Sequence, residues 1–273
     1  MISVINCSTV YAGLPLLEAV AAAQAAGFQA VELWWPFAEE VPDSAEVAAM
    51  CELFAPAGQV GERGERGQRG QGEQGGERGQ VEQQRTQQPA RPRLHAMNLY
   101  GGDMAAGQRG VLHQRQLQPG HLEAVAEIAR RTGLRYSNVL LGRSGSQVSA
   151  TQISRLEELV RHLSNLGVTA LIEPLSGMAD YPIRDALQAA ELAQATGAGV
   201  LADFYHLAAN GVDIADYLAR VRAGATPLPA HVQVADFPGR GAPGTAAAPL
   251  AQWVEQLQAA GYSGEVAGEW LAS

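Results

Sequence analysis

Short apolar runs alternate with longer amphipathic segments along most of the chain. The apolar runs are expected to be strands, and the Ala- and Leu-rich segments between them, several of which end at a glycine, are expected to be helices. This alternation predicts a parallel sheet covered by helices. The expected strands cover residues 1–9, 29–35, 93–99, 137–142, 169–176, 199–207, 231–237 and 265–271, and the expected helices cover residues 15–27, 45–55, 120–133, 149–167, 184–197, 213–222 and 248–261.

Eight strands in this order predict an α/β protein with the (β/α)₈ TIM barrel fold, here with a truncated eighth helix. The length of 273 residues suits a single TIM-barrel domain spanning residues 1–273. In such barrels the active site lies at the carboxyl ends of the strands. Side chains near those ends are therefore the first candidates for chemistry.

One segment, residues 58–93, departs from the pattern because it consists almost entirely of Gly, Gln, Glu and Arg. With so few apolar side chains it cannot offset its ordering entropy, so we predict a disordered, low-complexity insertion between the second helix and the third strand. An idle solvated loop and an interaction tether are both consistent with this composition. Because the connection lies opposite the carboxyl ends of the strands, the insertion is expected to leave the site intact.

Four polar side chains recur once per strand and helix unit, each late in an apolar run. They are Glu173, Asp203, Gln233 and Glu269. A polar group at the end of a buried strand is costly unless it is paired, hydrogen-bonded or bound to a cation. Any one of them alone could be a loop ion pair or a helix cap. Together, three carboxylates and an amide predict an oxygen-rich site for a hard divalent cation, Mg²⁺ or Mn²⁺.

Composition narrows the class of function. The net charge is −9, Lys is absent and all 19 basic residues are Arg, so a Schiff-base lysine is excluded and nucleic acid is not the expected partner. The N-terminus shows no secretory signal, and no apolar run is long enough for a membrane span. Cys7 and Cys51 are far apart and expected to be buried, reduced thiols. These features favour a cytoplasmic protein without a membrane partner.

Several motifs resemble the hydroxypyruvate isomerase family of the xylose isomerase-like barrels. They are GFQAVELWWP, NLYGGDMAAGQRG, IEPLSG, ADFYH, HVQVADFPGRGAPGT and the late GEW, and the likeness covers nearly the whole chain outside the insertion. The resemblance implies that Glu173 and Glu269 are the proton donor and acceptor and also bind the cation. It implies that Asp203 and Gln233 complete the ligand set, and that His206 and Arg240 hold oxygens of the substrate.

The activity that the resemblance implies is interconversion of hydroxypyruvate and 2-hydroxy-3-oxopropanoate (tartronate semialdehyde) through an enediolate. The substrate carboxylate needs a cationic partner, and Arg109 and Arg240 are the candidates because guanidinium pairs well with carboxylate. His231 shares a strand face with Gln233, so it is either a further substrate contact or a hydrogen-bonded structural histidine.

Two alternatives remain open at this point. One is a ketose 3-epimerase or another sugar isomerase using the same cation site, which a larger substrate pocket would favour. The other is a barrel that has lost activity and serves as a binding protein. The expected partner is a small hydroxy-carbonyl molecule, and barrels of this type often form homo-oligomers.

Overall fold

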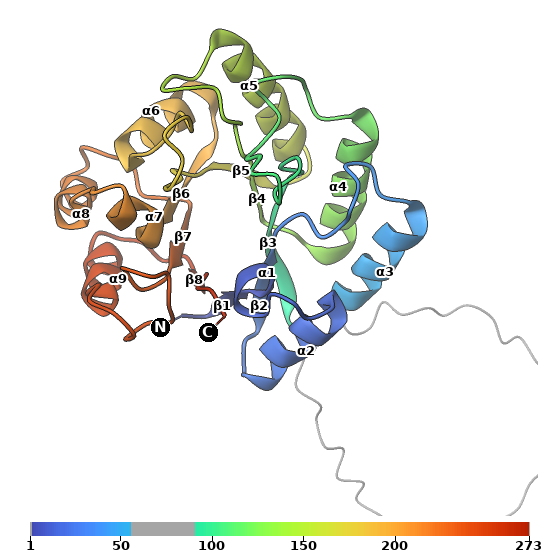
Figure 1. Ribbon diagram of the computed structural model, residues 1–273, viewed down its shortest axis with the longest axis horizontal. Helices are drawn as coiled ribbons and strands as arrows, with labels where there is room; N and C mark the ends of the chain where they lie inside the picture. The colour runs from blue at the N-terminus through green and yellow to red at the C-terminus, as the bar shows by residue number, and fades with distance from the viewer. Residues whose placement is uncertain (1, 56–90, 273) are drawn as a thin grey trace, which may run out of the picture.

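A computed structural model describes residues 2–55 and 91–272, and the expected insertion falls mostly outside these ranges, since residues 58–90 are not among them. In the described residues, eight parallel strands form a closed barrel in the order β1 to β8, and helices surround it (Figure 1). Each strand pairs with the next along the chain, and β8 closes the ring on β1 through the pair Ala267 and Val4. This confirms the TIM barrel predicted from the sequence.

The strands are short, and all of them run toward the same end of the barrel. They are β1 Val4–Asn6, β2 Ala30–Leu33, β3 Arg93–Asn98, β4 Tyr136–Asn138, β5 Thr169–Ile172, β6 Gly199–Asp203, β7 His231–Val234 and β8 Val266–Gly268. The helices are α1 Cys7–Val10, α2 Leu16–Ala25, α3 Ser44–Phe54, α4 Pro119–Thr132, α5 Ala150–Ser164, α6 Ala186–Thr196, α7 Phe204–Ala209, α8 Ile214–Arg222 and α9 Leu250–Ala259.

The apolar core lies between the strands and the surrounding helices. Helix α5 illustrates the packing: Leu156, Leu159 and Leu163 recur at helical spacing and are almost fully buried, as is Ile172 on the adjacent strand β5. Burying each such side chain contributes about 1.5 to 3 kcal/mol of hydrophobic free energy. Ser149 begins α5 with a capping box to Gln152, which satisfies backbone donors at the helix start.

Two short helices, α1 and α7, lie where the sequence predicted continued strands. Each begins directly after a strand, at a polar residue whose side chain caps it: Asn6 accepts from the backbone of Ser8, and Asp203 accepts from the backbone of Tyr205 and His206. The residues that follow each capping residue include apolar side chains, so the sequence pattern predicts that the strand continues. The prediction of strand for residues 204–207 is therefore wrong, because side-chain capping turns the backbone into a helix there.

In the described residues, which run to Ala272, no helix follows β8. Cys7 and Cys51 are free and buried, as expected. Within residues 2–55 and 91–272, every helix is too short or too polar to cross a membrane. In TIM barrels the active site lies at the carboxyl ends of the strands, so the candidate site is described there.

Candidate active site

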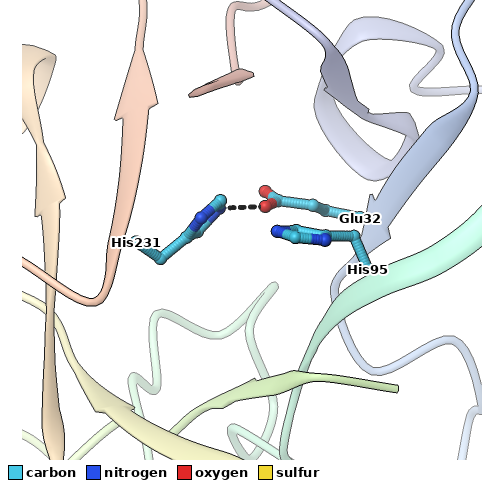
Figure 2. A group of neighbouring side chains, drawn as sticks. All are labelled: Glu32, His95 and His231. Atoms are coloured by element: carbon cyan, nitrogen blue, oxygen red, sulfur yellow. Dashed lines mark hydrogen bonds and ion pairs between the residues drawn. The ribbon is translucent and has the colours of Figure 1, made fainter. Parts of the chain in front are cut away.

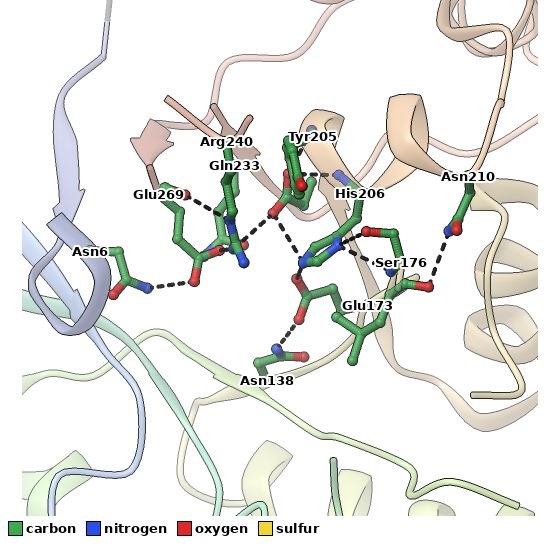
Figure 3. A network of polar contacts seen from close by, with 12 residues as sticks. Asn6, Asn138, Glu173, Ser176, Tyr205, His206, Asn210, Gln233, Arg240 and Glu269 are labelled. Atoms are coloured by element: carbon green, nitrogen blue, oxygen red, sulfur yellow. Dashed lines mark hydrogen bonds and ion pairs between the residues drawn. The ribbon is translucent and has the colours of Figure 1, made fainter. Parts of the chain in front are cut away.

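Polar side chains converge at the carboxyl ends of the strands, around a cavity of about 280 Å³ (Figure 3). Glu173 directly follows β5, Asp203 ends β6, Gln233 lies in β7 and Glu269 directly follows β8. All four are at least nine-tenths buried. The other four strands supply Asn6, Trp34, Asn98 and Asn138, each at or just past a strand end.

Glu173 is held from one side by the amide of Asn138, which donates to its Oε2 at 2.6 Å. Burial raises the pKa of Glu173 well above its ordinary value, and the neighbouring carboxylates Glu269 and Asp203 raise it further. The bond from Asn138 and the charge of Arg240 act in the opposite direction but do not outweigh burial. Without a cation, this carboxyl group therefore holds its proton more tightly than an ordinary glutamic acid does.

Glu269 accepts two hydrogen bonds on its Oε1, from Trp34 Nε1 at 3.0 Å and from Asn6 Nδ2 at 3.2 Å. Its Oε2 lies 3.0 Å from the guanidinium of Arg240. Burial raises the pKa of Glu269 to about 8, even though Arg240 lowers it. Raised pKa values in two glutamates at opposite sides of one cavity are what an acid and base pair needs.

Asp203 divides its two oxygens between the fold and the site. Its Oδ1 caps α7, at 2.7 Å from the backbone nitrogen of Tyr205. Its Oδ2 is buried and, among the described residues, accepts no hydrogen bond. Oδ2 lies 3.6 Å from Nη2 of Arg240 and 3.8 Å from Nε2 of His206. One oxygen of Asp203 is thus free for a ligand.

Gln233 likewise uses one end of its side chain within the fold and directs the other toward the site. Its Nε2 donates to Glu32 at 2.7 Å, while its Oε1 is buried and accepts no hydrogen bond within the described part of the chain. An unsatisfied buried acceptor costs about 1 to 3 kcal/mol, and two of them in one site call for an electron-poor partner. Together with the carboxylates of Glu173 and Glu269, the oxygens of Asp203 and Gln233 form a donor set that fits a divalent cation. We call these four residues the cage.

His206 lies in the first turn of α7 and faces the cage. The backbone N–H of Ser176 donates to its Nδ1 at 3.1 Å, so the ring proton of the neutral imidazole must be on Nε2. That Nε2 lies 3.9 Å from Glu173 Oε1 and 3.8 Å from Asp203 Oδ2. Burial lowers the pKa of His206 to about 4, which keeps the ring neutral. His206 is therefore arranged to donate a hydrogen bond into the cavity rather than to bind a cation.

Arg240 lies on the loop after β7, in a left-handed backbone conformation with φ of 55°. Its guanidinium reaches both Glu269 and Asp203, and it also lies 5.3 Å from the ring of Tyr205. The carboxylates keep the pKa of Arg240 above its ordinary value although burial lowers it. Arg240 thus supplies the positive charge nearest to the cage.

Arg109 lines the same cavity from the glycine-rich loop after β3. Its Nη1 donates to the backbone oxygens of Met104 and Gln108, at 3.0 and 2.7 Å. The loop is fixed by its neighbour Gly110, where φ is 97° and a Cβ atom would lie 1.9 Å from the backbone oxygen of Leu140. Only glycine allows this approach, which brings Arg109 to the cavity.

His231 begins β7, two residues before Gln233, so it lies deeper in the barrel than the predicted site residues at the carboxyl ends of the strands. Its Nε2 contacts Glu32 on β2 (Figure 2), and its ring stacks on Tyr136, which that figure does not draw. Burial would raise the pKa of Glu32, but His231 and Gln233 hold it below its ordinary value. The structure thus supports the structural alternative for His231 rather than a substrate contact.

Two groups in the described residues bring three ligand atoms within 4.8 Å of one another: Glu173, Asp203 and His206, and the deeper Glu32, His95 and His231. Buried groups of this kind suggest a metal site. Four further polar residues of the site or beside it, Asn6, Trp34, Asn138 and Glu32, are not among those predicted from the sequence. The rule that found the cage, a polar side chain in or just after a buried strand, would have found all but Trp34.

The closed parallel barrel and the polar ring at its carboxyl ends define a TIM barrel with a candidate metal site. A protein-family model described as "Xylose isomerase-like TIM barrel" matches residues 94–272. A Streptomyces coelicolor protein named "Putative hydroxypyruvate isomerase" is 32% identical over 285 residues, which cover 97% of this chain and 89% of that protein. The chain therefore belongs to the xylose isomerase-like TIM barrel family, as the sequence motifs implied.

Two further comparisons agree with this assignment. The Escherichia coli protein named "Hydroxypyruvate isomerase" is 27% identical over 188 residues, or 63% of this chain and 70% of that protein. A crystal structure described as an AP endonuclease, family 2, from Brucella melitensis matches with a TM-score of 0.73 at 21% identity, covering 100% of this chain and 94% of the other. The latter similarity shows the fold alone.

Proposed function

We propose that this protein is a cation-dependent isomerase that interconverts hydroxypyruvate and tartronate semialdehyde. The observation that carries the proposal is a pair of buried acceptors, Asp203 Oδ2 and Gln233 Oε1, that no described residue satisfies, beside two glutamates with raised pKa values. Relatives named hydroxypyruvate isomerase, at 32% and 27% identity, support the choice of substrate.

The proposed cofactor is Mg²⁺ or Mn²⁺, held by the cage. Three carboxylates and one amide oxygen are the ligands that hard divalent cations prefer, and the set contains no sulfur. Such a cation, when bound, would withdraw electrons from the carbonyl and hydroxyl oxygens of the substrate and so acidify the C–H between them. It would also remove the repulsion among Glu173, Asp203 and Glu269.

The proton transfers fall to Glu173 and Glu269. One carboxylate takes a proton from C3 of hydroxypyruvate, which leaves an enediolate across C2 and C3. A proton is then returned to C2 and the hydroxyl proton passes from O3 to O2, so the product is an isomer with no atom gained or lost. Nε2–H of His206 points toward the same space and can hold a substrate oxygen during the transfer.

The carboxylate of the substrate requires a positive partner in the cavity, and two guanidinium groups are available. Arg240 is nearer to the cage but is already paired with Glu269 at 3.0 Å. Arg109 also lines the cavity, and its Nη1 donates hydrogen bonds to two backbone oxygens. We propose that both take part, with planar, bidentate pairing as the source of selectivity for an acid.

A second candidate function is ketose 3-epimerisation, and one observation favours it. A second hollow of about 470 Å³ adjoins the first and shares Trp34, Asn98, Met104 and Leu140 with it. A sugar longer than three carbons would find room there. The same glutamates would then remove and return a proton at one carbon instead of two.

The test is an assay of purified protein on hydroxypyruvate and on several ketoses, with Mg²⁺, with Mn²⁺ and after chelation. We expect turnover of hydroxypyruvate that chelator abolishes and added cation restores. Glu173→Gln and Glu269→Gln should each lower turnover by about 10²- to 10⁴-fold, because each removes a proton-transfer group. Glu157→Gln on the exposed face of α5 is the matched control.

The outcomes separate the candidates. Turnover of ketoses alone would assign the protein to the epimerases. No turnover of any substrate, together with no cation binding, would favour a barrel that serves as a binding protein. Full activity in either glutamate variant would refute its acid and base role.

A further inference from the structure

Glu32 is a buried carboxylate that lies outside the cage, in the middle of β2, and it is 1% exposed. Its two oxygens face different partners. Oε1 contacts Nε2 of His231 (Figure 2). Oε2 accepts from Nε2 of Gln233 at 2.7 Å. Glu32 therefore connects the deeper cluster of Glu32, His95 and His231 to one member of the cage.

A glutamine amide has two ends of similar size and opposite character, an oxygen that accepts and an NH₂ that donates. A carboxylate only accepts, so Gln233 can face Glu32 only with its NH₂ group. The oxygen must then point away from Glu32, and it is this Oε1 that is buried with no hydrogen-bond partner in the described residues. The orientation of the amide, and hence the charge it presents to the cage, is decided by Glu32.

We propose that Glu32 is the positioning residue for cation binding, because it turns the carbonyl oxygen of Gln233 toward the cage. The inference rests on the proposed cation site and adds to it a residue that never touches the cation. His231 has a part in the arrangement, since its Nε2–H donates to Oε1 of Glu32 and leaves Oε2 for Gln233.

The deeper cluster could instead be read as a second metal site, but its geometry argues against this. Glu32 and His231 are in direct hydrogen-bond contact, whereas a cation between two ligands, each about 2.0 to 2.2 Å from it, would hold them farther apart. Both oxygens of Glu32 are already engaged by Gln233 and His231. The remaining member, His95, has an Nε2 that makes no hydrogen bond to Glu32 or to any other described residue.

The variant Glu32→Gln tests the proposal while keeping the size of the side chain. His231 Nε2–H would hold the oxygen of the new amide, so its NH₂ would face Gln233. Gln233 would then turn its own oxygen to residue 32 and present NH₂ to the cage, where it repels a cation. Loss of such an outer hydrogen-bond partner typically lowers metal affinity by about 10- to 100-fold, and we expect a loss of this size for Mn²⁺.

The exchange variant Glu32→Gln/Gln233→Glu provides the rescue. Its total charge equals that of the wild type, and the new carboxylate at position 233 can accept from the amide at position 32 with one oxygen and offer the other to the cation. We expect it to recover most of the lost affinity. His95→Asn is the control, because it alters the deeper cluster without touching Gln233, and its Mn²⁺ affinity should equal that of the wild type.

The measurement is calorimetric titration of chelator-treated, full-length protein with MnCl₂, with melting followed by circular dichroism to verify that each variant is folded. Wild-type affinity in folded Glu32→Gln would overturn the inference, and so would a loss that the exchange variant does not restore. Binding of two Mn²⁺ ions, the second lost in His95→Asn, would also overturn it by making Glu32 a ligand. If the wild type binds no Mn²⁺, the cage itself is refuted, which is a different result.

Discussion

Asp236 anchors the loop that carries Arg240, and replacing it by Asn gives a prediction with a magnitude. The side chain is fully buried just after β7. Its Oδ1 accepts from the backbone nitrogens of Phe237 and Ala248, at 2.9 and 3.0 Å, and its Oδ2 from those of Gly244 and Ala246, at 2.9 and 2.8 Å. Four backbone donors thus depend on one carboxylate.

In Asp236→Asn, either orientation of the amide leaves one oxygen with two donors and sets an NH₂ group against the other two. Two hydrogen bonds to a charged group are lost, each contributing about 1.5 to 3 kcal/mol, so we expect the free energy of unfolding to fall by about 3 to 6 kcal/mol. The loop should loosen with it, and the turnover that depends on Arg240 should decrease.

Urea denaturation followed by circular dichroism measures the change. Asp180→Asn is the matched control, because Asp180 is an exposed partner of Arg143 and such surface pairs contribute little to stability. A loss below about 1 kcal/mol for Asp236→Asn would refute the reasoning.

The pH dependence of the Asp236 effect has a definite sign. Burial alone would raise the pKa of Asp236, but the backbone donors bring it below its ordinary value. A carboxyl group with a lowered pKa stabilises the fold above its ordinary pKa, and this contribution is lost as pH falls through the folded value. The difference between wild type and Asp236→Asn should therefore shrink in acid.

Three further predictions concern the cage. The pKa values of Glu173 and Glu269 are raised, that of Glu269 from 4.5 to about 8. The cation-free protein should therefore lose stability as the pH rises from 4.5 to about 8. The increase in Tm caused by Mn²⁺ should become larger over the same pH range, because the cation binds the deprotonated carboxylates. Trp34→Phe removes a hydrogen bond that lowers the pKa of Glu269, so the acidic limb of the kcat/KM profile should move to higher pH. Arg240→Lys should raise KM for hydroxypyruvate, measured by steady-state kinetics, because Lys cannot pair with a carboxylate through two nitrogens.

The order of strands and helices could be predicted because the periodicity of apolar residues and the positions of glycines are local features of the sequence. Helix α7 was missed because Asp203 both ends β6 and caps the next helix, and the residues after it, Phe204 and Leu207, are as apolar as a strand. The pattern of apolar residues does not distinguish a continued strand from a short capped helix here. The deciding interaction is a side chain bonding to its own backbone, which periodicity does not record.

The structure brought the four predicted cage residues to one end of the barrel because one-per-strand spacing places them at equivalent positions. The same spacing could not show how far each side chain lies from the carboxyl end of the barrel. His231 precedes Gln233 by two residues and shares its face, yet it lies one layer lower, on Glu32. Glu32, a single Glu among apolar residues of β2, fits the same rule as the cage residues, but its two partners on a distant strand, which make its burial tolerable, could not be predicted from the sequence.

The central claim is that the cage binds one divalent cation, and anomalous diffraction from crystals soaked in MnCl₂ tests it most directly. We expect one strong peak at the carboxyl ends of the strands, in contact with Asp203 Oδ2, Gln233 Oε1 and the carboxylates of Glu173 and Glu269. The absence of a peak there, or a peak only at Glu32 in the deeper cluster, would contradict the account.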